Sequence, residues 1–287
     1  ENDAVLIQPP VYYPFKEVVE DNHRRLVNNT LVLGGDGTYT IDYEDFEKKI
    51  IEENVKLFIL CNPHNPVGRV WTKEELERLG DICLKHGVFV VSDEIHADFV
   101  FERKHTVFSE VKEAYRDISM ICTSPSKTFN IAGTKNSYVV IENPKLRISN
   151  PEKATAFRRQ VAAAGYSQVG LPGLVACEAA YRHGDEWLEG VLAYIKANAE
   201  FTRAYLQEHL PRVKMTKLEG TYLVWLDFRD YGLTDKELDE KILNQAGLWL
   251  DSGAVFGKCG EGFQRINIAC PRKTLQQALD RLIDVFA

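Results

Sequence analysis

Short hydrophobic runs alternate, over the first half of the chain, with segments whose hydrophobic residues recur every three or four positions. The first pattern is typical of buried strands and the second of amphipathic helices. The expected strands are 4–7, 30–33, 56–61, 88–92, 118–123 and 137–141. Strands this short and apolar, separated by helices, predict an α/β fold with a mainly parallel sheet between layers of helices.

One helix of this half is marked at both ends. Thr72 and Glu75 have the spacing of a capping box, in which each side chain bonds the other's backbone N–H. Gly87 follows the last turn, where a glycine commonly ends a helix. The pattern predicts a helix between these signals.

The pattern changes after residue 141. A helix is expected after Pro151 and a longer one over about 186–209. Residues 221–228 alternate like a half-exposed strand, and 264–269 predict another. Helices are expected after the capping pair Thr234 and Glu237 and at the C-terminus. We therefore expect a large domain over 1–185 and a smaller α+β domain over 186–287, joined by the helix 186–209.

Composition excludes several classes of protein. The 287 residues carry a net charge of −7 without a Lys/Arg cluster, so nucleic acid is not an expected partner. No apolar run approaches the roughly 18 residues of a membrane-spanning helix. Six widely spaced cysteines indicate free thiols in a reducing compartment, which predicts a cytoplasmic protein. Because the chain opens on Glu1 and enters a strand at once, we expect further residues upstream.

Reactive side chains stand where the expected strands end. Asp93 follows the run 88–92, and Lys127 follows the run 118–123 in a Ser/Pro turn. Ligands of open parallel sheets bind beyond the carboxyl ends of the strands. A lysine there can hold an aldehyde cofactor as a Schiff base, and a carboxylate can keep a cofactor ring nitrogen protonated. We expect Lys127 to be partly buried, which would lower the pKa of its amine.

Each of these residues also has a structural interpretation. A lysine such as Lys127 is by itself typical of a solvated surface charge. Asp93 could cap a following helix, although the pattern over 95–101 predicts an extended segment there. His96 reads as a structural or supporting histidine. Asn65 lies among prolines, where asparagine commonly makes a turn. Ser124 either closes its turn or binds phosphate.

The same choice applies to three further side chains. One of Tyr12 and Tyr13 is expected to be a core aromatic. Arg265 interrupts a strand pattern, so it is either an edge-strand arginine facing water or a fork for a carboxylate.

Six stretches in order along nearly the whole chain resemble fold-type I pyridoxal-phosphate (PLP) enzymes, the aspartate aminotransferase superfamily. They are most similar to its C–S lyase branch, the cystathionine β-lyases and cystalysin. The stretches are 9-PPVYYPF-15, 61-CNPHNPVGRVW-71, 92-SDEIHADF-99, 125-PSKTFNIAG-133, 219-EGTYLVWLDF-228 and 262-GFQRINIACP-271.

This resemblance implies a role for each candidate residue. Lys127 would hold the cofactor aldehyde, Asp93 the pyridine nitrogen and Asn65 the ring hydroxyl. Arg265 would bind the substrate α-carboxylate. The other implied cofactor contacts are Tyr12 stacked on the ring, Tyr13 close by, His96 where many aminotransferases have a tyrosine, and Ser124 with Ser126 at the phosphate. Lys135 stands where aminotransferases often carry a phosphate-binding arginine.

The resemblance also implies a homodimer whose site lies at the subunit interface. A phosphate-binding turn and a tyrosine donated to the neighbouring subunit would precede residue 1. The leading hypothesis is α,β-elimination from L-cystathionine or a related L-cysteine S-conjugate, giving a thiol, pyruvate and ammonia. An aminotransferase would use the same residues, and a truncated, non-catalytic module is the third hypothesis.

Overall fold

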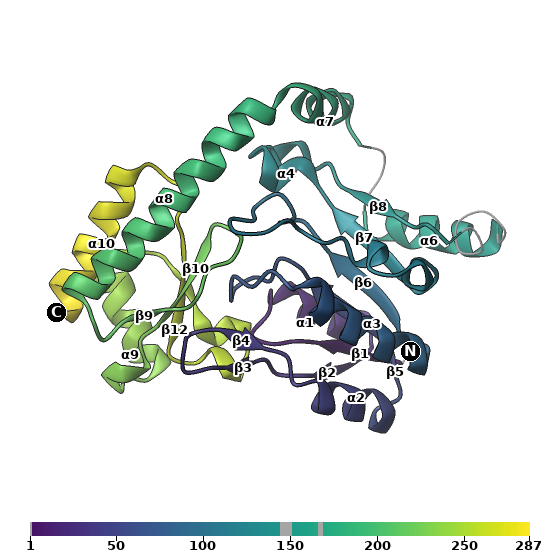
Figure 1. The fold of residues 1–287 in the computed structure, drawn as a ribbon, viewed down its shortest axis with the longest axis horizontal. Coiled ribbons are helices and arrows are strands. Elements are labelled where there is room, and N and C mark those ends of the chain that lie inside the picture. Colours follow the sequence, from purple (N-terminus) through teal and green to yellow (C-terminus); the bar gives the residue numbers. More distant parts are fainter. Residues whose placement is uncertain (1, 144–150, 166–168) are drawn as a thin grey trace.

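A six-stranded sheet forms the larger half of the molecule (Figure 1). The computed structural model describes residues 2–143, 151–165 and 169–287. The sheet order is β2-β1-β5-β6-β7-β8, with only β8 antiparallel to its neighbour. Its strands are β1 (Ala4–Ile7), β2 (Arg25–Asn28), β5 (Val55–Cys61), β6 (Phe89–Asp93), β7 (Ser119–Thr123) and β8 (Tyr138–Val140). The expected, mainly parallel sheet is thus present.

Two details of this sheet differ from the expectation. The run 30–33 yields only β3 (Val32–Leu33), which pairs with β4 (Tyr39–Thr40) in a separate two-stranded sheet. The edge of the main sheet is instead β2, which the hydrophobic pattern does not reveal. Arg25 and Asn28 at its ends are exposed, so β2 lacks the continuous apolar run of a central strand.

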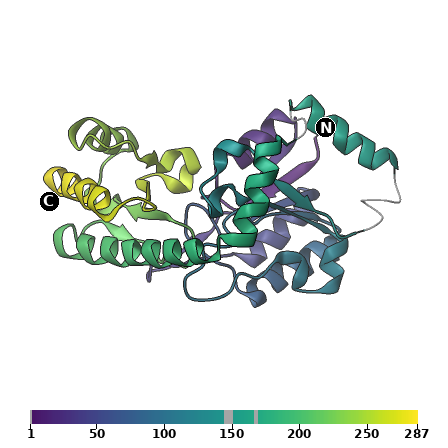
Figure 2. The same ribbon diagram turned by 90° about the horizontal axis from the view of Figure 1, so that it is seen from above.

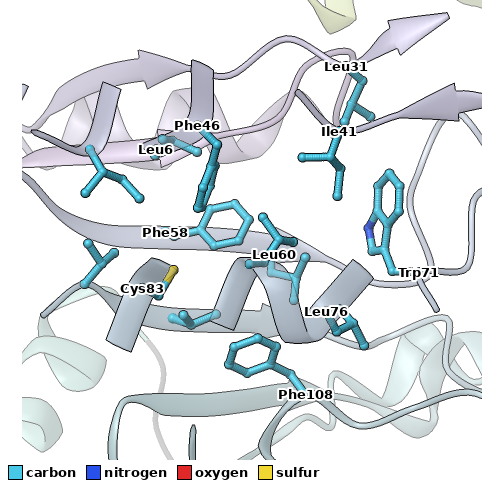
Figure 3. Close-up of a cluster of buried hydrophobic side chains, with 14 of the residues drawn as sticks. Leu6, Leu31, Ile41, Phe46, Phe58, Leu60, Trp71, Leu76, Cys83 and Phe108 are labelled. Atoms are coloured by element: carbon cyan, nitrogen blue, oxygen red, sulfur yellow. The ribbon is translucent and has the colours of Figure 1, made fainter. Parts of the chain in front are cut away.

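Alternate residues of the central strands pack against helices on opposite faces. Leu6, Phe58 and Leu60 belong to a core covered by α2 (Tyr43–Glu52) and α3 (Lys73–His86) (Figure 3). Ile7 and Cys61 point the other way and pack against α1 (Pro14–Asp21). Successive side chains of a strand point to opposite faces, so residues buried on both sides require this double cover.

The end signals of α3 are confirmed. Thr72 and Glu75 form the reciprocal capping box, and Gly87 ends the helix with a left-handed φ of 65°. Glycine adopts this conformation without the steric cost that a Cβ would bring. The termini of α3 therefore follow from local sequence alone.

A four-stranded antiparallel sheet of order β11-β12-β10-β9 forms the C-terminal part. Its strands are β9 (Lys214–Met215), β10 (Leu223–Asp227), β11 (Asp251–Ser252) and β12 (Phe263–Asn267). The long helix α8 (Asp185–His209) runs from beside the large sheet to the small one, where α10 (Arg272–Phe286) lies along it (Figures 1 and 2). The division into domains at 185/186 stays a prediction.

Strand β10 is buried on both faces, which corrects the expectation of a half-exposed strand. Trp225 packs into the core of the large sheet, whereas Val224 and Leu226 pack into the C-terminal core. This strand therefore joins the two cores.

The remaining elements are short or peripheral. They are α4 (Pro125–Thr128), α6 (Pro151–Ala163), α7 (Leu171–His183), α9 (Asp235–Glu240) with the π-helical turn η5 (Lys241–Gln245), and the 3-10 turns η1 (Phe108–Glu110), η2 (Glu113–Asp117), η3 (Ala132–Thr134), η4 (Arg229–Tyr231), η6 (Gly253–Phe256) and η7 (Lys258–Gly260). Among the described residues, no helix is both long and apolar enough to cross a membrane.

Candidate active site

The carboxyl ends of β5, β6 and β7 lie side by side and carry the predicted side chains. Asp93, the last residue of β6, is in register with Cys61 on one side and Cys122 on the other. The loop after β5 holds Asn65, and the turn after β7 holds Lys127. Three segments far apart in sequence thus meet at one edge, the position where parallel sheets bind ligands.

Asp93 has one oxygen in use. Its Oδ1 accepts a hydrogen bond from the backbone N–H of Ile95 at 3.1 Å. Burial raises the pKa of Asp93 to about 6, although the Ile95 hydrogen bond and the Lys127 charge act in the opposite direction. Residues 95–98 form a turn, so the expected extended segment is wrong and the capping interpretation is partly right. The side chain remains ionised for the most part at pH 7.

Lys127 lies in the single turn of α4, which Ser124 caps. Ser124 Oγ accepts from the Ser126 N–H at 3.0 Å and donates to the Asn136 carbonyl at 2.5 Å. Thr128 Oγ1 donates to Asp98 Oδ2 at 2.6 Å and anchors the turn to the loop after β6. Lys127 itself is exposed, so the expected partial burial is wrong. The hydrogen bonds that hold this turn in place are made by the neighbours of Lys127, which are Ser124, Ser126 and Thr128.

Arg265 is partly buried on an inner strand of the C-terminal sheet. Strand β12 lies between β11 and β10, so the interpretation as an edge-strand arginine facing water is wrong. Its Nη1 donates to Asn65 Oδ1 at 2.8 Å, and its Nη2 donates to Asp251 Oδ2 at 2.5 Å. The Asn65 bond spans 200 positions of sequence and brings the C-terminal sheet to the strand ends of the large sheet.

The two tyrosines divide as expected. Tyr13 packs against the core and meets Phe256 at a ring-centroid distance of 5.9 Å. Tyr12 is more exposed, with its backbone N–H bound to the Asn65 carbonyl. Burial, followed by the charges of Tyr13 and Asp93, raises the pKa of Tyr12. Tyr12 is therefore the ring available beside Asp93.

His96 is buried, and its Nδ1 has no hydrogen-bond partner among the described residues. Its ring meets Tyr222 edge-on at 5.5 Å. Burial, assisted by the nearby charges of Lys127 and Arg265, lowers the pKa of His96 to about 3. A neutral imidazole with an unused nitrogen is therefore available to a ligand.

The lowered pKa of His96 makes a prediction about stability. His96 binds a proton near pH 6.5 in the unfolded chain but only near pH 3 in the folded chain. The free energy of unfolding therefore decreases as the pH falls from 6.5 to 3. In the apoprotein, His96→Gln should remove about 1.4 kcal/mol per pH unit from that loss between pH 6 and 4. Urea unfolding at several pH values measures it. The exposed His183→Gln is the matched control, and an unchanged slope in His96→Gln would contradict the assignment.

Lys135 directly precedes Asn136, whose carbonyl accepts a hydrogen bond from Ser124 Oγ. Lys135 is exposed at the left-handed residue that ends η3. Within the described ranges, no hydrogen bond or ion pair connects it to Ser124, Ser126 or Lys127. Its phosphate-binding role stays a prediction.

Three residues of the site escaped the sequence analysis. Tyr222 packs on His96, and Asp251 pairs with Arg265. Glu94 is buried beside Asp93, where it accepts hydrogen bonds from Ser92 Oγ at 2.8 Å and Phe108 N at 3.0 Å, and pairs with His105 at 2.6 Å. Two adjacent acids at the end of a buried strand were the available signal for Glu94, because one of them must point inward.

These side chains fit pyridoxal phosphate on the chemistry of their donors. A partly buried carboxylate with a free oxygen suits a protonated ring nitrogen, and the Asn65 amide nitrogen and the unused His96 nitrogen suit a ring oxygen. The Tyr12 ring offers a stacking face, and the Lys127 amine is accessible to an aldehyde.

Comparison with known proteins agrees with this reading. The family model "Aminotransferase class I and II" matches residues 1–282. Cystathionine β-lyase PatB of Bacillus subtilis is 45% identical over 98% of this chain and 70% of its own length. Cystalysin of Treponema denticola, a structure with pyridoxal 5'-phosphate, superposes with a TM-score of 0.92 at 37% identity, covering 99% of this chain and 70% of cystalysin.

A third relative supports the same branch. The PLP-bound C–S lyase of Staphylococcus hominis superposes with a TM-score of 0.88 at 33% identity, covering 100% of this chain and 71% of that one. The chain therefore belongs to the aminotransferase class I and II family, in the branch that holds these cystathionine β-lyases and C–S lyases.

Proposed function

We propose that this chain carries the active site of a PLP-dependent carbon–sulfur β-lyase. Its substrate would be L-cystathionine or a related L-cysteine S-conjugate, and its products a thiol, pyruvate and ammonia. The observation that carries the proposal is the meeting of Lys127 and Asp93 at one edge of the large sheet, which Arg265 reaches through its hydrogen bond to Asn65. The names of two of the relatives, a cystathionine β-lyase and a C–S lyase, support elimination as the reaction.

The residues divide the work by their chemistry. Arg265 binds the substrate α-carboxylate with its two remaining N–H groups, which fixes the amino acid in orientation. Asp93 keeps the cofactor ring nitrogen protonated. When bound, pyridoxal phosphate draws electron density from the substrate α-carbon. Lys127 would hold the cofactor aldehyde as a Schiff base, and its free amine would serve as the base for the substrate α-proton.

His96 is suited to donate a hydrogen bond without adding charge. With its pKa lowered to about 3, the imidazole stays neutral at the pH of catalysis. It therefore leaves Lys127 and Arg265 as the nearby cations and Asp93 as the counter-charge. A protonated histidine in this place would repel both cations.

An assay of the full-length holoenzyme separates this proposal from transamination. With L-cystathionine and no added keto acid, we expect continuous formation of pyruvate and thiol in equal amounts. An aminotransferase would return the proton to the cofactor and stop after one turnover unless a keto acid is supplied. Turnover that depends on keto acid would therefore contradict the lyase. Absence of the yellow cofactor absorbance would support the non-catalytic module.

We further propose a cytoplasmic homodimer. All six cysteines are free, which suits a reducing compartment. The dimer rests on the family resemblance, in which the site forms between subunits. Sedimentation of the full-length protein at micromolar concentration should give twice the chain mass, and a single chain mass would contradict the dimer.

A further inference from the structure

Asp251 holds one edge of the Arg265 guanidinium. The two residues are direct cross-strand partners in the antiparallel pair β11–β12. Asp251 Oδ2 accepts from Nη2 at 2.5 Å and from Nε at 3.2 Å. The cation also lies 5.0 Å from the centre of the Phe256 ring. The carboxylate and the ring together restrict how the guanidinium can turn.

The donor count decides what remains for a ligand. A guanidinium has five N–H groups in a fixed plane. Asp251 uses two of them, on Nε and Nη2, and Asn65 uses one on Nη1. One N–H is left on each terminal nitrogen. These two can donate to the oxygens of a carboxylate, so a substrate can bind without displacing Asp251.

The charge of Asp251 is less important than its hydrogen bonds. Its side chain is 46% exposed, whereas that of Arg265 is 12% exposed. Water therefore screens the repulsion between Asp251 and an incoming carboxylate. The two hydrogen bonds act at short range and orient the cation directly.

We propose that Asp251 is a positioning residue that holds Arg265 with its free N–H pair toward the substrate α-carboxylate. The inference rests on the proposed function, in which Arg265 binds that carboxylate. It deepens the proposal by making carboxylate recognition depend on a pair across two strands of the C-terminal sheet. Asp251 itself does not touch the substrate.

Two substitutions in the full-length holoenzyme test this role. Asp251→Ala should raise the KM for L-cystathionine about tenfold or more, with kcat within about twofold, because charged hydrogen bonds of this kind correspond to at least that factor. Asp251→Asn retains an oxygen that can accept from Nε and Nη2, so it should restore KM to within about threefold of the original. A lower KM in Asp251→Ala would mean that Asp251 competes with the substrate, and an unchanged KM that it positions nothing; either overturns the inference.

Equilibrium binding supplies a second readout. L-alanine and ethylamine share the amine, but only L-alanine has the carboxylate, and both can be titrated through the cofactor absorbance. Asp251→Ala should weaken L-alanine about tenfold and leave ethylamine unchanged. Equal weakening of both would overturn the inference.

Arg265→Ala distinguishes the positioning role of Asp251 from the carboxylate-binding role of Arg265. If it weakens L-alanine and Asp251→Ala does not, the positioning role fails while the proposed function stands. If Arg265→Ala leaves L-alanine binding unchanged, Arg265 is not the carboxylate site and both fail. Unaltered melting temperatures in all three variants confirm that the comparison concerns folded protein.

Discussion

Replacing Lys127 by alanine in the full-length holoenzyme is expected to lower kcat for cystathionine cleavage by more than about a thousandfold. The amine is assigned both the covalent link to the cofactor and the transfer of the α-proton, and general acid–base catalysis alone contributes about 10²–10⁴. Lys127→Arg should lower kcat by a similar factor. A guanidinium keeps the positive charge, but it neither condenses with an aldehyde nor gives up its proton at neutral pH. Steady-state pyruvate formation measures both.

Lys104→Ala is the matched control, since Lys104 is an exposed lysine on the loop after β6. It should retain kcat within about twofold. The absorbance of the internal cofactor link should disappear in Lys127→Ala and persist in the control. A Lys127→Ala enzyme that retained kcat would contradict the assignment of the nucleophile and, with it, the proposed function.

Local sequence predicts the parts of this fold that local energetics determine. Strand β1 is buried on both faces, and most residues of β5, β6 and β7 are buried or partly buried, so their hydrophobic runs are nearly continuous and their ends can be recognised in the sequence. Helix α3 carries its own capping box and terminal glycine. The positions of these strand ends in the sequence are enough to predict that Asp93, Asn65 and Lys127 lie at the same edge of the sheet.

What sequence did not predict depends on contacts between distant segments. Strand β10 alternates like a surface strand, yet two cores bury both of its faces. Asp251 becomes recognisable only once β11 pairs with β12. Lys127 is predicted to be partly buried because it follows a buried strand, but burial of a long side chain depends on what packs over it. Which strands pair, and how exposed a side chain is, depend on the folded structure as a whole and cannot be predicted from local sequence.

The second large effect is expected at Glu219, which lies outside the proposed chemistry. Its side chain is 3% exposed, and it accepts hydrogen bonds from Arg69 Nε at 2.8 Å, Val70 N at 3.1 Å and Arg103 Nη2 at 3.0 Å. Arg69 also pairs with Glu75 at 2.8 Å. The bond to Arg69 spans 150 positions and joins the loop after β5 to the approach to β10.

Glu219→Ala should lower the free energy of unfolding by about 3–5 kcal/mol, because it leaves the buried Arg69 with one carboxylate fewer. Urea unfolding of the apoprotein at pH 7 measures the loss, and the exposed Glu208→Ala should stay within about 0.5 kcal/mol of the original. Adding Arg69→Met to Glu219→Ala should cost less than the sum of the two single changes, since the partners interact directly.

The same network positions part of the site. Gly220, next to Glu219, packs so closely that a Cβ there would lie 2.5 Å from the Phe99 carbonyl oxygen, and Tyr222, two residues further along, packs on His96. Glu219→Ala should therefore also weaken cofactor binding, whereas a change that only lowered stability would leave the dissociation constant of the folded fraction unaltered. A Glu219→Ala protein within about 1 kcal/mol of the original would show that Glu75 and the Tyr39 carbonyl together satisfy Arg69, and that this network does not join the two sheets.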